Sequence, residues 1–66
     1  MIEVHLIYSL SEGESYSRPF DSVYFQRVNG GISVIDTETN QEVEFISDAM
    51  PIAEAEYRIN KIINPF

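Results

Sequence analysis

Residues 23–36 read VYFQRVNGGISVID and place Asn29 and Gly30 between two runs that are rich in β-branched and aromatic side chains. Asn-Gly between such runs is the strongest short signal for a β-hairpin, because a type I′ turn needs positive φ at both central residues. The sequence therefore predicts strands over residues 22–28 and 32–37, joined by a two-residue turn.

The register of this hairpin follows from the pattern of its side chains. A two-residue loop sets Phe25 opposite Val34 and Tyr24 opposite Ile35. A slip by one residue would instead pair Gln26 with Val34 and mix polar with apolar side chains on each face. We therefore expect the two-residue loop.

A third strand is expected over residues 42–47, after a loop over residues 37–40. That loop fits a type I turn followed by a left-handed residue, a conformation that Asn40 tolerates, and the Asp36 carboxylate is expected to accept hydrogen bonds from the turn amides. An uninterrupted register then puts one apolar face on the sheet, made of Val23, Phe25, Ile32, Val34, Val43 and Phe45.

The N-terminal segment shows apolar residues at alternate positions from Ile2 to Tyr8, with Ile7 as the one exception. This period of two predicts a half-buried strand over residues 2–9. Residues 10–19 have no periodicity and are expected to form a mobile loop. The position of this first strand in the sheet stays open.

The C-terminal segment is expected to be a helix that begins at Asp48 or Ser47 as N-cap, with Pro51 in its first turn, and ends at Asn64-Pro65. Glu54 and Arg58 form an i,i+4 pair in the favourable order. The apolar stripe of this helix is Ile52, Ala55, Ile59, Ile62 and Ile63. The predicted fold is a single α+β domain over residues 1–66, with a mostly antiparallel sheet of about four strands and one C-terminal helix on its apolar face.

Length and charge narrow the classes of function. The chain has 66 residues, no cysteine and a net charge of −7. A negative protein lacks the positive surface that direct binding to nucleic acid or to an anionic membrane requires. No apolar run reaches the roughly 20 residues of a membrane span, and the N-terminus lacks a basic region typical of a signal peptide. The expected compartment is the cytoplasm.

Few residues suit catalysis or metal binding. His5 is the only histidine, no nucleophile motif accompanies it, and we expect it on a solvent-exposed face. The carboxylates do not have metal-ligand spacing, and no basic residue follows Gly30-Gly31 to hold a phosphate. Glu42 and Glu44 are paired carboxylates, but so small a domain has little material for the cleft that a glycosidase needs around such a pair. We therefore predict no catalytic residue, no metal site and no cofactor.

The surface carries the functional hypothesis. Between Val28 and Tyr57 the chain has no Lys or Arg, and an uninterrupted register places Glu42 and Glu44 on the sheet face that the helix leaves open. The predicted partner-binding residues are the acidic Asp36, Glu38, Glu42 and Glu44 and the apolar Tyr24, Val28, Ile35 and Ile46, with Ile7 beside them. These residues predict a non-enzymatic interaction module, such as an inhibitor or a nucleic-acid mimic, that binds a basic protein.

Two alternatives remain open. One is a structural or regulatory subunit that is stable mainly as a homodimer or other homo-oligomer. The other is a small enzyme that uses His5. A charge excess retained only for solubility would explain the acidic surface without any partner.

Overall fold

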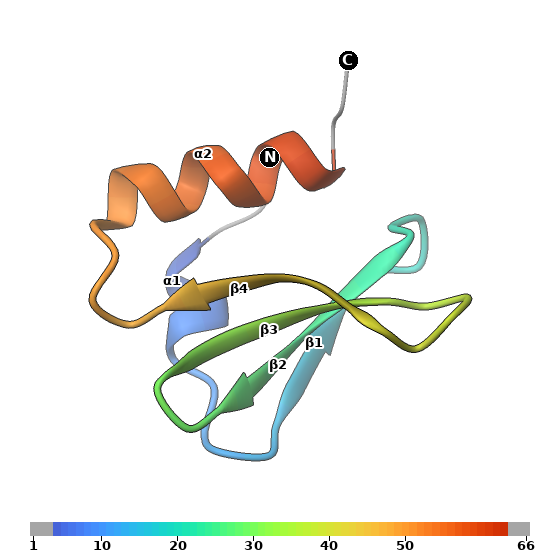
Figure 1. The fold of residues 1–66 in the computed structure, drawn as a ribbon, viewed down its shortest axis with the longest axis horizontal. Helices are drawn as coiled ribbons and strands as arrows, with labels where there is room; N and C mark the ends of the chain where they lie inside the picture. The colour runs from blue at the N-terminus through green and yellow to red at the C-terminus, as the bar shows by residue number, and fades with distance from the viewer. Residues whose placement is uncertain (1–3, 64–66) are drawn as a thin grey trace.

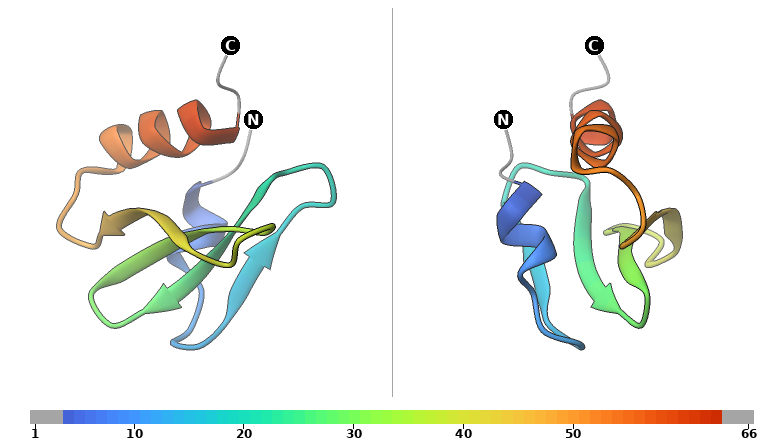
Figure 2. Two further views of the ribbon diagram at one scale, coloured as in Figure 1. Left: turned by 45° about the vertical axis from the view of Figure 1, so that its right-hand side comes forward. Right: turned by 90° about the vertical axis from the view of Figure 1, so that its left-hand side faces the viewer.

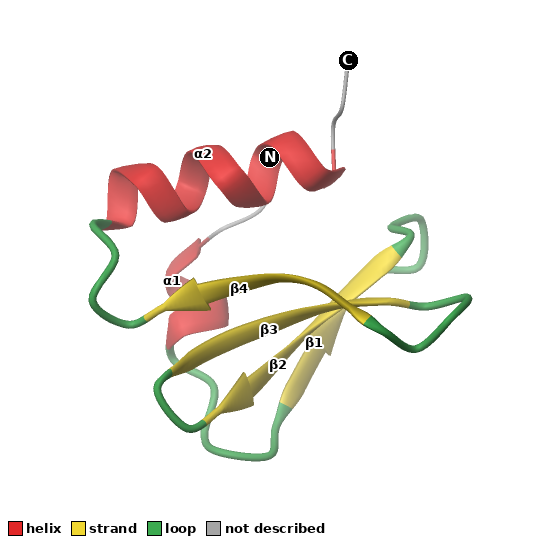
Figure 3. Ribbon diagram, viewed as in Figure 1, coloured by secondary structure: helices red, strands yellow, loops and turns green. Residues whose placement is uncertain are grey.

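The computed structural model describes residues 4–63 and shows four strands and two helices in this part of the chain. They are α1 (Val4–Tyr8), β1 (Ser15–Ser17), β2 (Val23–Val28), β3 (Gly31–Asp36), β4 (Glu42–Ser47) and α2 (Ile52–Ile63). The strands form one antiparallel sheet in the order β1-β2-β3-β4 (Figures 1 and 3). The α+β prediction is confirmed. No helix within residues 4–63 is long and apolar enough to cross a bilayer.

The expected N-terminal strand over residues 2–9 is wrong. Residues from Val4 to Tyr8 form the short helix α1, which ends where the Ser9 amide and hydroxyl donate to the carbonyls of His5 and Leu6. Ile7, the residue that broke the alternation, is fully buried, whereas Leu6 is exposed. The apolar side chain that contributes to the core is therefore the exception to the strand pattern.

The edge of the sheet beside β2 is occupied by β1, inside the segment expected to be a mobile loop. Tyr16 of β1 lies opposite Phe25, with ring centroids 6.5 Å apart. The connection to β2 is tightened by Arg18, whose guanidinium donates two hydrogen bonds to Asp21 at 2.7 and 3.0 Å. The connection between β1 and β2 is much shorter than a connection from the expected strand over residues 2–9 to β2 would be. A shorter connection lowers the entropy cost of pairing with β2.

The central hairpin has the predicted register. Tyr24 pairs with Ile35 and Phe25 with Val34, and Val28 and Gly31 flank the two-residue loop. The turn type differs from the prediction, because Gly30 has φ +88° whereas Asn29 does not have positive φ. Positive φ at the second central residue alone is the pattern of a type II turn.

The loop between β3 and β4 also has the predicted features. Asn40 has φ 59°, and the Asp36 carboxylate accepts hydrogen bonds from the amides of Glu38 and Thr39 at 2.7 and 3.3 Å. These bonds satisfy amides that the turn leaves without ladder partners.

The predicted pairing of β3 with β4 is wrong by one residue. A β-bulge between Val34 and Ile35 pairs Val34 with Glu44 and Ile32 with Ile46. Val43 is the extra residue, so the side chains that follow it change faces. Phe45 therefore leaves the predicted apolar face.

The hydrophobic core lies between the two helices and one face of the sheet. It contains Ile7 from α1, Ala55 and Ile59 from α2, and Val23, Phe25, Ile32, Val34 and Ile46 from the strands. We call this side of the sheet the inner face and the opposite side the outer face. In the right-hand view of Figure 2, α1 overlaps β1 and α2 lies above the strands.

Helix α2 has the expected stripe except for Ile52, but not the expected cap. Its first turn closes when the Ala55 amide donates to the Pro51 carbonyl at 3.0 Å, so Pro51 holds the cap position. Ser47 instead closes the preceding turn, because its hydroxyl accepts from the Ala49 amide. Ala55 and Ile59 are fully buried, whereas Ile52 is 50% exposed. The predicted stop at Asn64-Pro65 lies outside the described residues.

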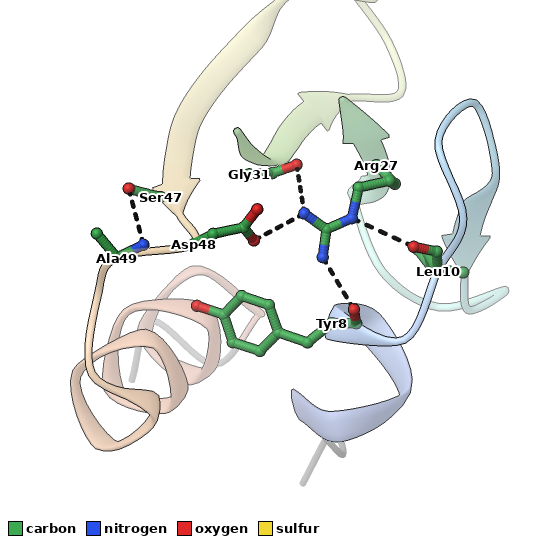
Figure 4. Close-up of polar contacts among 7 residues, drawn as sticks. All are labelled: Tyr8, Leu10, Arg27, Gly31, Ser47, Asp48 and Ala49. Carbon is green, nitrogen blue, oxygen red and sulfur yellow. Dashed lines mark hydrogen bonds and ion pairs between the residues drawn. The ribbon is translucent and has the colours of Figure 1, made fainter. Parts of the chain in front are cut away.

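Arg27 joins four segments of the chain (Figure 4). Its guanidinium donates to the backbone carbonyls of Tyr8, Leu10 and Gly31 at 2.9, 3.2 and 3.3 Å, and to the Asp48 carboxylate at 2.7 Å. Five fixed donors make arginine suited to such a node. This single side chain fixes α1 and its following loop against β3 and the β4–α2 connection.

Candidate functional site

The outer face is the side of the sheet opposite the core that the two helices and the inner face enclose. Strand pairing arranges its side chains in rows across the strands. One row contains Ser17, Tyr24, Ile35 and Glu42, the next contains Ser15, Gln26, Ser33 and Phe45, and the last contains Val28, Gly31 and Ser47. Only one of these eleven positions, Glu42, is charged, and the others are polar, aromatic, aliphatic or glycine.

Phe45 is the most prominent apolar side chain of the outer face. It is 41% exposed, and the neighbouring bulge residue Val43 is 54% exposed. The ring lies over Gly31, because a Cβ atom at that position would come within 2.7 Å of Phe45 Cζ and would also collide with the Ile46 carbonyl oxygen. The Phe45 ring can therefore occupy this position because Gly31 has no side chain.

A set of polar contacts fixes the side chains around Phe45. The Ser33 hydroxyl donates to Glu42 at 2.6 Å, and the Tyr24 hydroxyl donates to the Asn40 side chain at 2.7 Å. Ile35, between Tyr24 and Glu42, is almost fully buried although it does not belong to the core cluster. The two hydrogen bonds hold polar side chains of the outer face in defined positions.

The predicted acidic residues do not form one patch on the sheet. Asp36 is engaged by the turn amides and Glu38 lies in the exposed β3–β4 loop. The bulge leaves Glu42 on the outer face and turns Glu44 to the inner side, where it meets Arg58 at 3.6 Å. The expectation that Glu42 and Glu44 share an uncovered face is therefore wrong.

Residues 29–56, which contain no Lys or Arg, carry less uncompensated negative charge in the folded structure than the sequence suggests. Arg27 and Arg58, which flank this stretch, reach back to Asp48 at 2.7 Å and Glu44 at 3.6 Å. Local neutralisation of this kind is invisible in a count of charges along the sequence.

The predicted placement of the apolar residues on this face is confirmed in part. Tyr24, Val28 and Ile35 lie on the outer face, as their pairing requires. Ile46 and Ile7 do not, because both are fully buried in the core. Phe45 takes the place that was expected for Ile46. The adjacent pair Phe45-Ile46 gives no sequence signal for which of the two faces inward.

The candidate residues for catalysis and metal binding lie apart from one another. His5 is exposed on α1, as expected, although on a helix rather than a strand. No group of three or more His, Asp or Glu side chains within the described residues could hold a metal ion. Gly30 serves the hairpin turn.

A groove between α2 and β4 was not anticipated from the sequence. It has a volume of about 410 Å³ and is lined by Glu44, Tyr57, Arg58, Lys61 and Ile62. The sequence did predict the pairing of Glu54 with Arg58, which are 3.9 Å apart, but not that Arg58 also reaches β4. Only the tertiary packing of α2 on the sheet brings these residues together.

No protein-family model, curated protein or solved structure matches this chain.

Proposed function

We propose that this protein is a non-enzymatic interaction module that binds a basic protein through the outer face of its sheet. The observation that carries this proposal is Phe45, a large aromatic side chain that is 41% exposed on the face of the sheet opposite the core. An aromatic anchor inside a polar rim is typical of the residues that contribute most to protein–protein affinity.

The neighbours of Phe45 support the same function. Ser33 and Gln26 share its row, and Tyr24 lies one row away. Tyr and Ser side chains provide contact area and hydrogen bonding at low entropic cost, as in binding surfaces built from loops.

The net charge of −7 sets the expected kind of partner. A field of this sign accelerates encounter with a positively charged surface and disfavours a negative one. On the outer face itself Glu42 is the one carboxylate, so charge steers the approach of the partner and Phe45 holds it. An inhibitor of a basic, nucleic-acid-binding protein is one form that such a module takes.

Site-specific photocrosslinking tests the proposal. The photoreactive residue p-benzoylphenylalanine replaces Phe45 in one variant and Phe20, which is 98% exposed in the β1–β2 connection, in the control variant. Both are irradiated in cell lysate and their adducts are identified by mass spectrometry. We expect the Phe45 variant to give a discrete adduct with a protein of high isoelectric point that the Phe20 variant does not give.

Three results would count against this function. Identical adducts from both variants would show that contact does not depend on the outer face. An acidic partner would contradict electrostatic steering. An adduct with a second copy of this chain would favour the homo-oligomeric subunit instead.

A further inference from the structure

The groove between α2 and β4 has a positive rim in an otherwise acidic protein. Arg58 and Lys61, two of the four basic residues of the chain, both line it. Lys61 Nζ lies 5.8 Å from the centroid of the Tyr57 ring, and no ion pair of Lys61 is found within residues 4–63. Ile62 contributes an apolar wall. This combination suits an anionic group that carries an apolar substituent.

The edge of β4 contributes free backbone groups beside this groove. The Asp48 amide donates to the Gly30 carbonyl at 3.0 Å, and Ser47 pairs with Gly31. Because hydrogen-bonded and non-hydrogen-bonded pairs alternate in an antiparallel ladder, the N–H and C=O of Phe45 point away from β3. With β4 last in the strand order, no strand of the described chain pairs with them.

A carboxylate already lies where an incoming anion would bind. Glu44 Oε1 accepts a long hydrogen bond of 3.4 Å from the Phe45 amide and lies 3.6 Å from Arg58 Nη1. Both distances exceed those of strong charge-assisted hydrogen bonds, which are about 2.7–2.9 Å. The chain therefore holds its own carboxylate loosely between a backbone donor and a guanidinium.

We propose that this groove binds the C-terminal carboxylate of an extended polypeptide that ends in an apolar residue. The terminal carboxylate displaces Glu44 and binds the Phe45 amide, Arg58 and Lys61. The last side chain lies against Tyr57 and Ile62, and the preceding backbone pairs with the edge of β4. Glu44 then acts as a competing internal anion. This inference concerns the groove and does not depend on the proposed function of the outer face.

The test uses acetyl-Gly-Ser-Val-Ser-Val-Leu with a free carboxylate, and the same peptide with a C-terminal amide, titrated into the whole ¹⁵N-labelled chain. We expect shifts that centre on the amide of Phe45 and on Tyr57, Lys61 and Ile62. The amide peptide should bind at least tenfold more weakly. Equal affinity of the two peptides, or no shifts at millimolar peptide, would overturn the proposal.

Charge variants give the sharper discrimination, because the proposal predicts opposite signs for two residues of one groove. Glu44→Gln should raise the affinity at least threefold by removing the competing anion, and Lys61→Gln should lower it at least fivefold. Glu54→Gln is the matched control, since it removes an equal charge that also faces Arg58 but does not line the groove. A thermal melt of each variant confirms that it is folded. An equal gain from Glu44→Gln and Glu54→Gln would show only a general charge effect and would refute displacement.

Discussion

Arg27 Nη1 and Asp48 Oδ1 form an ion pair of 2.7 Å that connects β2 with the segment between β4 and α2. The Arg27 side chain is mostly buried, whereas that of Asp48 is half exposed. The ring of Tyr8 lies beneath this pair (Figure 4). Two sequence-distant segments and the N-terminal helix are thus held by one guanidinium.

Replacement of Arg27 should therefore be among the most damaging single changes. Arg27→Met keeps the apolar stem but removes the donors to three carbonyls and to Asp48. We expect a loss of about 2–3 kcal/mol in the free energy of unfolding, since hydrogen bonds from a charged donor are lost and three partly buried carbonyls lose a partner. Urea denaturation measures this loss. Arg58→Met, which breaks only exposed pairs, should cost less than about 0.5 kcal/mol. Equal losses would show that Arg27 has no special role.

Removal of the Tyr8 hydroxyl should increase stability, in contrast to the loss expected for Arg27→Met. The Tyr8 hydroxyl is buried and has no hydrogen-bond partner within the described residues. Tyr8→Phe should raise the free energy of unfolding by about 1 kcal/mol, because it removes an unsatisfied polar group and keeps the ring. A loss of stability in the same urea experiment would mean that the hydroxyl is satisfied in solution.

Tyr8 also predicts a pH dependence of stability. Burial raises the pKa of Tyr8, the negative charge of Asp48 raises it further, and Arg27 opposes the rise. The folded state then holds its proton more tightly than the unfolded state, so stability is fully present below the unfolded pKa of about 10 and falls as the pH rises through it. Denaturation series between pH 8 and 11 should show a steeper decline for the wild type than for Tyr8→Phe. Parallel curves would contradict the shift.

The two adjacent glycines should be intolerant of alanine for different reasons. Gly30 has open space around its Cα but φ +88°, so Gly30→Ala should cost about 1 kcal/mol in backbone strain. Gly31 lacks positive φ, but an added Cβ would meet the Ile46 carbonyl and the Phe45 ring. We expect Gly31→Ala to be the more damaging of the two in thermal melts. A smaller effect at Gly31 would mean that the Phe45 ring does not rest there.

The difference between predicted and observed features has local physical causes. The Asn29-Gly30 loop and the Asp36 turn were predictable because their side chains or φ values act within a few residues. The bulge was not, because Phe45 and Ile46 are both apolar and only the packing of α2 and the gap at Gly31 decide between them. The helix α1 was missed because the alternation of Ile2, Val4, Leu6 and Tyr8 predicted a strand, whereas the residue that is buried in the core is Ile7, which lies outside that alternation.

The residues of the candidate surfaces were likewise predicted correctly where local pairing decides their position, and incorrectly where distant contacts decide it. The apolar residues of the hairpin were placed on the correct face, because the hairpin register was correct. The acidic residues were not, since the bulge separates Glu42 from Glu44. The groove and the Arg27 node depend on contacts between residues far apart in sequence, for which a single chain gives no periodic signal.

Two isoleucines of α2, Ile59 and Ile52, should differ in how much their replacement by alanine lowers stability. Ile59 is fully buried in the core cluster, so Ile59→Ala should cost about 2–5 kcal/mol, which approaches the whole stability of so small a domain. Ile52→Ala at the half-exposed start of the same helix is the control and should cost far less. Chemical denaturation of both variants decides this. Similar losses would contradict the packing of this helix face.

The most direct test of the account is the affinity of the protein captured by photocrosslinking for three forms of this chain. Wild type, Phe45→Ser and Phe20→Ser are compared by surface plasmon resonance at low and high salt. We predict that Phe45→Ser weakens binding by about thirtyfold, as expected when an anchor worth about 2 kcal/mol is lost, while Phe20→Ser binds like wild type. The association rate of the wild type should fall as salt rises, because the net charge steers the encounter. Unchanged affinity of Phe45→Ser, or an association rate that is independent of salt, would contradict the proposed function.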